Sequence, residues 1–181
     1  PVGLFTVIMA VWLQRDPRRW LRRLGLAALG AVVIQGVLGG LTVIYQLPKP
    51  VSIGHACLAQ LFFSTTVVIA MVTSASWREI PALIADSGRP SLRWLAAAAP
   101  VMALAQVGLG AAYRHKAAGL MPHVAGAVVL AGLVVYTSSV ILTQYSGHRR
   151  LRGSAVHLMS VTLVQVFLGI AAYMSRITYT E

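Results

Sequence analysis

Long apolar runs separated by short polar joints dominate the chain. A helix needs about 20 apolar residues to cross the hydrocarbon core of a bilayer. Five runs are long enough, at residues 24–45, 51–73, 92–113, 122–143 and 155–175. Residues 1–13 are apolar but shorter, and we interpret them as the second half of a further span. The pattern predicts an all-α membrane protein, a helical bundle with five complete spans and one partial span.

Composition agrees with a lipid environment. Of the 181 residues, 57% are hydrophobic and 10% are charged, whereas about 25% of the residues in a soluble domain are charged. The net charge of +11 would suit a nucleic-acid partner. We expect no such partner, because the cations gather in the joints between apolar runs, where they orient membrane proteins. Cys57 is the single cysteine, which excludes a disulfide within the chain.

The joints divide their cations unequally between the two sides of the membrane. One alternate set carries eleven: Arg15, Arg18, Arg19, Arg22, Arg23, Arg78, Arg89, Arg93, Arg149, Arg150 and Arg152. The other set carries four: Lys49, Arg114, Lys116 and Arg176. Because Lys and Arg favour the cytoplasmic side, we expect the first set to lie inside. The helices that begin near residues 51 and 122 then start at the outer face.

An internal repeat relates two parts of the chain. The string Gln-x-x-Leu-Gly occurs three times, at residues 35–39, 106–110 and 165–169. His55 follows Gln35 by 20 residues, and His123 follows Gln106 by 17. The repeat predicts two similar bundles, each of which alternates a Gln-Gly helix with a helix that carries a histidine.

The two histidines of the repeat are candidate ligands of haem iron. Polar residues at membrane depth are functional candidates, and His55 and His123 enter their spans at the same depth. Each has an alanine one turn later, Ala59 or Ala127, which leaves room for a flat macrocycle. Imidazole is an axial ligand of haem iron, and helix bundles hold such cofactors in their interiors. The alternative is a structural hydrogen bond from each histidine to a neighbouring carbonyl.

Other kinds of site find less support. A structural zinc site needs four ligands, and the chain has no cluster of Cys and His residues. A Ser-His-Asp arrangement is unsupported, because Asp16 and Asp86 both lie on the predicted cytoplasmic side. His148 and His157 flank the inner arginine cluster, and we assign them no role.

Arg114 and His115 are candidate contacts for the propionate groups of a haem. They lie beside Lys116 in an outer joint, and cations hold carboxylates by charge-assisted hydrogen bonds. We expect them to serve the second bundle, that of His123. The alternative is that they anchor the end of their helix at the membrane interface.

Four segments carry a resemblance to a known family: "QGVLGGLTV", "VSIGHACLAQLFF", "QVGLGAAYRH" and "MPHVAGA". They resemble the haem A synthase family of cytochrome oxidase assembly proteins, in particular a short bacterial branch. The resemblance covers nearly the whole chain, and "HACLAQLFF" is its most specific part. It implies a parent protein of eight transmembrane helices in two pseudo-symmetric four-helix halves, each with a pair of outer-side histidines.

The resemblance also implies which parts of that parent are present. Residues 1–80 match the end of the second helix and the third and fourth helices, with His55 as one ligand. Residues 81–181 match the fifth to seventh helices, with His123 as another. We expect the acidic catalytic residue of the family before Pro1, and the eighth helix after the end of the chain. One ligand of each pair is then present, and the fragment alone is expected to be inactive.

The activity that the resemblance implies is an oxidation in haem biosynthesis. Haem O would be converted to haem A by oxidation of its C8 methyl group to a formyl group, and a haem b would pass electrons. The protein would lie in the inner membrane of a bacterial cell, with His55 and His123 toward the outer face. The candidate partners, besides the bilayer, are haem O synthase, a haem-delivery protein and a second copy of the chain. The resemblance does not identify the electron donor.

Three other functions stay open at this point. A membrane haem-b-binding electron-transfer or assembly protein would share the bundle without oxidising the methyl group. A transporter would account for a repeat, but it needs broken helices with polar groups at the midplane. Here the polar residues lie at the outer ends, and Pro100 is the one obvious helix breaker in the spans. A structural assembly subunit would bind no haem.

Overall fold

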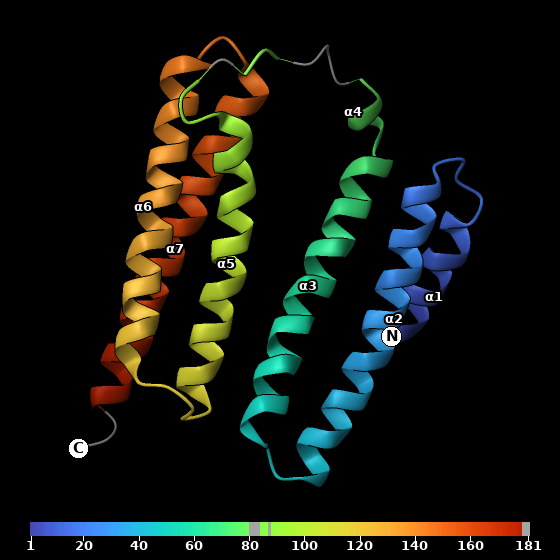
Figure 1. The fold of residues 1–181 in the computed structure, drawn as a ribbon, viewed down its shortest axis with the longest axis vertical. Coiled ribbons are helices and arrows are strands. Elements are labelled where there is room, and N and C mark those ends of the chain that lie inside the picture. The colour runs from blue at the N-terminus through green and yellow to red at the C-terminus, as the bar shows by residue number, and fades with distance from the viewer. Residues whose placement is uncertain (80–83, 87, 179–181) are drawn as a thin grey trace. The chain divides into compact units, whose positions relative to one another are not determined.

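The computed structural model describes residues 1–79, 84–86 and 88–178 (Figure 1). The helices are α1 (Val2–Leu13), α2 (Arg19–Ile44), α3 (Lys49–Thr73), α4 (Ala75–Arg78), α5 (Leu92–Arg114), α6 (Leu120–Gln144) and α7 (Arg149–Thr178). No β-strand occurs in these residues. Five helices, α2, α3, α5, α6 and α7, are long and apolar enough to cross a membrane, and α1 is a shorter apolar helix. The predicted all-α, multi-pass membrane fold is confirmed.

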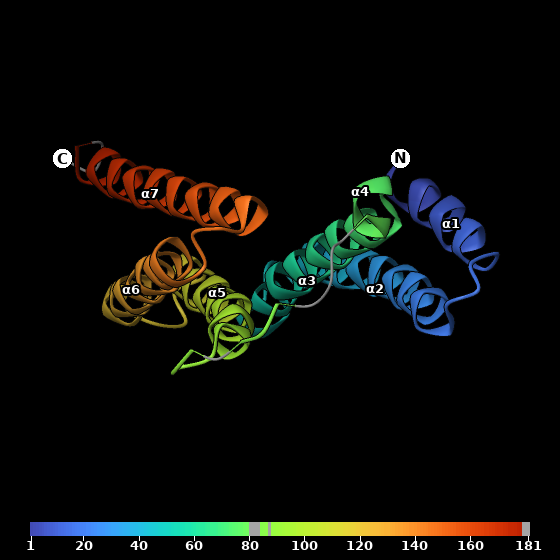
Figure 2. The same cartoon turned by 90° about the horizontal axis from the view of Figure 1, so that it is seen from above.

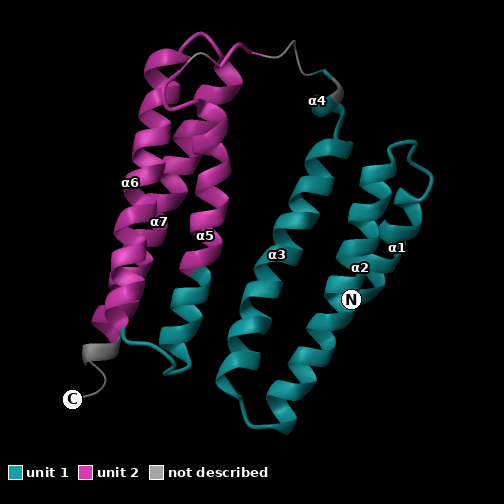
Figure 3. Cartoon of the chain, in the orientation of Figure 1, with its two compact units in different colours: residues 1–83, 107–119 teal, residues 84–106, 120–181 magenta. Residues whose placement is uncertain are grey.

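The chain divides into two compact units (Figure 3). Unit 1 consists of Pro1–Leu83 and Val107–Gly119, and unit 2 of Ile84–Gln106 and Leu120–Glu181. The division falls inside α5, so the last turns of that helix belong with α1 to α4. The predicted halves 1–80 and 81–181 concern the topology of a longer parent protein and stay a prediction.

In unit 1, α1 packs against α2 and α2 packs against α3 (Figures 1 and 2). The buried core consists of Leu13, Leu21, Ala28, Ile69 and Val72. Gly25 allows the close approach of α1 and α2, because a Cβ at this position would lie 2.8 Å from Cδ1 of the fully buried Leu13. The packing of the first helix pair therefore depends on a position without a side chain.

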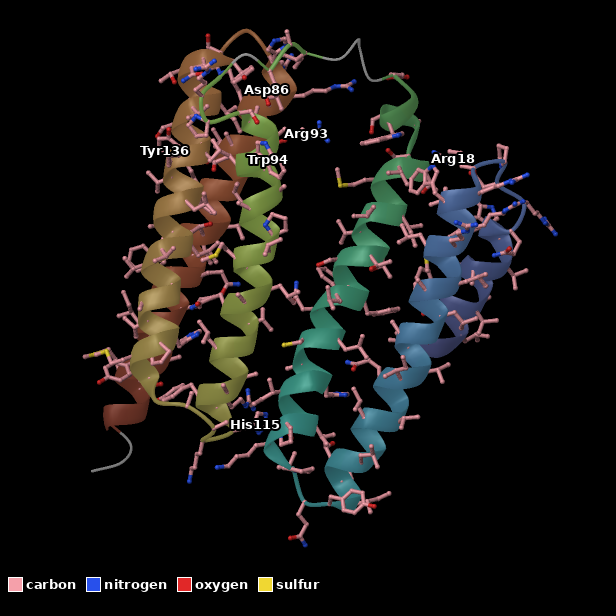
Figure 4. All side chains as sticks on the ribbon, in the orientation of Figure 1. Arg18, Asp86, Arg93, Trp94, His115 and Tyr136 are labelled. Carbon is pink, nitrogen blue, oxygen red and sulfur yellow. The ribbon has the colours of Figure 1, made fainter. Side chains whose placement is uncertain are left out.

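Arg18 joins the connection between α1 and α2 to the end of α3 (Figure 4). Its guanidinium donates to Asp16 Oδ1 and Oδ2 at 2.9 and 2.8 Å, and to the carbonyl oxygen of Val72 at 3.0 Å. The last carbonyls of a helix have no intrahelical partner and favour a cation. The hydrogen bond to Asp16 raises the pKa of Arg18. Arg18 therefore stays charged and caps α3.

In unit 2, α6 packs against α7 (Figures 1 and 2). A buried cluster consists of Leu95, Val140 and Tyr145, with Leu92, Leu133 and Leu151 packed against it. Ser138 is fully buried, and its hydroxyl donates to the carbonyl oxygen of Ala155 on α7 at 3.4 Å. Small and hydroxyl-bearing residues at such contacts let membrane helices approach closely.

Asp86 caps the start of α5 from the preceding connection (Figure 4). Its carboxylate accepts the backbone N–H groups of Arg93 at 2.9 Å and Leu92 at 3.0 Å, and the hydroxyl of Tyr145 at 2.9 Å. The first N–H groups of a helix lack intrahelical partners. The backbone hydrogen bonds from Arg93 and Leu92 hold the pKa of Asp86 below its ordinary value. The hydrogen bond to Asp86 raises the pKa of Tyr145.

The outer faces of the long helices are apolar. Val43 and Trp94, for example, are 79% and 74% exposed. Soluble monomers rarely expose large contiguous apolar patches, but in a bilayer the solvent itself is apolar. These faces agree with spans that contact lipid.

Candidate functional site

His55 lies in the second turn of α3, a helix whose start the sequence marks with prolines. Pro48 is the N-cap residue and Pro50 lies in the first turn, where the missing N–H costs nothing. The imidazole is half-buried and makes no hydrogen bond to any described residue, and its Nδ1 atom is fully buried. A buried polar atom without a partner is costly and marks a candidate site.

A cavity of about 530 Å³ adjoins this histidine within unit 1. It is lined by Thr42, Leu47, Ser52, His55, Ala56, Val107, Gly110, Ala111, Arg114 and His115. Its volume falls within the range of about 300–1,000 Å³ that is usual for cofactor and ligand sites. The hydroxyl of Ser52 is also buried without a partner. Leu47 has a φ of 60°, and backbone strain of this kind gathers at functional sites.

Arg114 and His115 give this cavity a basic wall. Both line it together with His55, and Figure 4 shows His115 beside the start of α3. We expected these two residues to serve the second bundle, but the structure places them in the cavity of the first histidine. A hydrogen bond of 2.9 Å from Lys49 Nζ to the carbonyl oxygen of Lys116 joins the two connections at this end of unit 1. The wall suits an anionic group on the ligand.

Two glycines of the repeat lie near His55 or line its cavity. Gly39 closes the motif at 35–39, and a Cβ there would lie 3.4 Å from Cε1 of His55. Gly110 closes the motif at 106–110 and lines the cavity directly. The alanines that line the cavity are Ala56, next to His55, and Ala111 of α5; Ala59, one turn after His55, is not among the lining residues. The Gln-x-x-Leu-Gly repeat singled out these glycines in the sequence. It did not indicate that both of them belong with His55.

His123 has a different environment, in unit 2. It lies in the first turns of α6, and its ring and backbone both contact Gln106 of α5. Gln106 Nε2 donates to the carbonyl oxygen of His123 at 2.8 Å and lies 3.1 Å from His123 Nδ1. The spacing of 17 residues in the repeat therefore corresponds to a direct contact. The predicted alternative was a hydrogen bond from the histidine to a neighbouring carbonyl, whereas the ring of His123 contacts the side-chain amide of Gln106.

Comparison with known proteins adds the family. A family model of cytochrome oxidase assembly proteins (COX15-CtaA) matches residues 1–124. The chain belongs to this family. The match includes His55, Arg114, His115 and His123. No curated protein and no solved structure matches the chain.

Membership of this family supports a role in cytochrome oxidase assembly. The family is that of haem A synthase, so the resemblance seen in the sequence is confirmed. Within residues 1–79, 84–86 and 88–178, no group of three or more His, Cys, Asp or Glu side chains could hold a metal ion. An axial imidazole of a haem needs no such group, because the macrocycle itself supplies four ligands of the iron.

Proposed function

We propose that this cytochrome oxidase assembly protein acts as a haem A synthase, which oxidises the C8 methyl group of haem O to a formyl group. His55 and His123 would be axial ligands of two haems, a substrate haem O and a haem b, toward the outer face of a bacterial inner membrane. Family membership supports the role in oxidase assembly. The cavity at His55 supports a haem site.

The residues around His55 fit a haem. The imidazole has no hydrogen bond to a described residue, so it is free to ligate iron. Gly110 lines the cavity without a side chain, and a Cβ at Gly39 would lie 3.4 Å from the ring. Arg114 and His115 would hold the propionates by charge-assisted hydrogen bonds. A bound haem would supply redox-active iron.

The chain's own residues would set the position of the substrate. With Arg114 and His115 at the end of α5, the propionates would point toward the connections at this end of unit 1. The hydrogen bond between Lys49 and Lys116 would hold those connections in place. The single observation that carries the proposal is the free His55 imidazole in a cavity with a basic wall.

The first prediction tests this role of His55. We would express the complete gene that encodes this chain in a bacterium without haem A synthase and measure extracted haem A by chromatography. The wild-type protein should produce haem A, and His55→Ala should reduce it below detection, because substrate haem would lose its axial ligand. His157→Ala is the matched control, since His157 is exposed and its Nδ1 lies 2.7 Å from the carbonyl oxygen of Gly153 on its own helix. Equal haem A from His55→Ala and His157→Ala would contradict the proposal.

One observation favours a second candidate, a membrane haem-b-binding electron-transfer or assembly protein without methyl oxidation. No carboxylate is among the residues that line the His55 cavity. In the described part of the chain, the acidic residues are Asp16, Glu79 and Asp86, all outside the candidate spans. This candidate predicts haem absorption that depends on His55 without any production of haem A, so the same experiment separates the two.

A further inference from the structure

We infer that Gln106 is a positioning residue that holds His123 in a ring tautomer unable to ligate iron, so that haem can bind at His123 only after this amide moves. The inference rests on the proposed function, in which His123 is an axial ligand. It goes beyond that function because it assigns a role to a residue of the neighbouring helix and predicts unequal access to the two histidines.

The orientation of the Gln106 amide follows from its contacts. Its nitrogen lies 2.8 Å from the carbonyl oxygen of His123, which can only accept a hydrogen bond. If the amide were turned over, its own oxygen would face that carbonyl oxygen with no proton between them. The nitrogen therefore occupies this position and donates to the carbonyl.

The amide orientation then determines the tautomer of the ring. The same Gln106 nitrogen lies 3.1 Å from His123 Nδ1. An amide nitrogen donates and does not accept, so Nδ1 must be the acceptor. In a neutral imidazole only one ring nitrogen carries a proton. The proton of His123 therefore lies on Nε2.

This arrangement blocks ligation through either nitrogen. An Nε2 atom that carries the proton has no lone pair for iron, and Nδ1 is occupied by the amide. A metal-bound histidine usually donates its other N–H to an acceptor, which for His123 would require Gln106 to present its oxygen. That oxygen is buried without a partner in the present arrangement. Haem binding at His123 therefore has to break the hydrogen bond of 2.8 Å to the carbonyl.

The first histidine provides an internal contrast. Gln35 stands at the equivalent place in the repeat, yet no hydrogen bond between described residues joins it to His55, whose Nδ1 is buried without a partner. No described contact holds His55 in one tautomer. Haem should therefore bind at His55 without displacing an amide, whereas binding at His123 carries that additional cost. Gln35 is the matched control position for Gln106.

The tautomer can be measured without haem. The chain would be labelled with ¹⁵N-histidine, placed in phosphatidylcholine nanodiscs, and its ring ¹⁵N shifts recorded by NMR. His123, identified by the loss of its signals in His123→Ala, should be in the Nε2–H form. Gln106→Ala and the similarly sized Gln106→Met should give a mixture of both forms, and Gln35→Ala should leave His123 unchanged. A wild-type His123 with the proton on Nδ1 would overturn the inference.

The consequence for binding can be measured with haemin. In a His55→Ala background, titration of the nanodisc protein would report the His123 site by its Soret absorption. Gln106→Ala should bind haemin about tenfold more tightly, since the hydrogen bonds of the amide no longer need to be broken. Gln35→Ala should show no change. Unchanged or weaker binding by Gln106→Ala would overturn the inference while leaving His123 as a ligand. If no haemin absorption depended on His123, the ligand assignment in the proposed function would be wrong. The role inferred for Gln106 would then be wrong as well, even if NMR showed the expected ring tautomer.

Discussion

At the scale of single residues, Gly39 is a position where the backbone of α2 comes close to the ring of His55. Even a methyl group at this position would lie 3.4 Å from Cε1, at the near limit of ordinary contact. The next residue, Gly40, has no atom within 4 Å of the corresponding point. Two adjacent glycines of the same helix therefore differ in whether a side chain would disturb the imidazole.

This difference gives a prediction for haem binding. Gly39→Val should weaken haemin binding at His55 about tenfold, because valine has one preferred rotamer in a helix and the ring would have to move aside. Gly40→Val carries the same helix-propensity change and should bind as the wild-type protein does. Both would be titrated with haemin in a His123→Ala background. Equal affinities of the two valine variants would show that Gly39 does not shape the site.

At the scale of helices, the pair α1 and α2 depends on Gly25. A Cβ there would lie 2.8 Å from Leu13 Cδ1 and 3.6 Å from the Cα atom of Ala10. Leu13 is fully buried within the unit 1 core, so it has little room to move. Gly30, one and a half turns later on α2, has open space around it.

Gly25→Ala should therefore destabilise unit 1 by about 1–3 kcal/mol, as overpacking of a core does. Gly30→Ala should be neutral or stabilising by up to about 1 kcal/mol, because alanine is the better helix former. Thermal unfolding of the protein in detergent, followed by circular dichroism, measures both. A Gly25→Ala protein as stable as Gly30→Ala would show that α1 does not pack on α2 in this way.

The cap of α5 gives a prediction about pH. The pKa of Asp86 is lowered in the folded state. Its carboxylate therefore stabilises unit 2 when the pH is above about 3.9, the pKa of the group in the unfolded chain. That contribution is lost as the pH falls through the lower folded pKa. Asp86→Asn should thus melt at a lower temperature than the wild type at neutral pH, and the difference should close as the pH falls below about 4. Tyr145→Phe leaves the backbone hydrogen bonds to Asp86 in place, so its melting temperature should keep the pH dependence of the wild type. If the melting temperatures of Asp86→Asn and the wild type differed by the same amount at every pH, this account would be contradicted.

At the scale of the whole molecule, the spans were predictable because lipid requires long apolar helices. The ends of the helices were less predictable. For example, α2 begins at Arg19 rather than at residue 24, because its backbone hydrogen bonding continues into the basic joint. The histidines stood out as polar groups in apolar runs. Their surroundings did not, because the placement of His115 beside His55 and of Gln106 on His123 depends on how helices far apart in sequence pack.

The charge asymmetry also predicts an orientation in the membrane. The Lys49–Lys116 hydrogen bond agrees with two connections on one side of the bilayer. In a Cys57→Ala background, Lys49→Cys and Lys116→Cys should react with an impermeant maleimide in intact cells. Arg150→Cys should react only after permeabilisation, because the positive joints favour the cytoplasm. Labelling of Lys49→Cys and Arg150→Cys in intact cells alike would exclude this topology.

The contact of Arg18 with Val72 has a consequence for biogenesis. The acceptor lies 54 residues after the donor, so it leaves the ribosome roughly 3 to 10 s later at ordinary rates of synthesis. Until then the contacts of its guanidinium are local, with Asp16 and with the ring of Trp20, each two residues away. The α1–α2 pair would thus enter the membrane with its arginine already oriented, and the insertion of α3 would complete the joint.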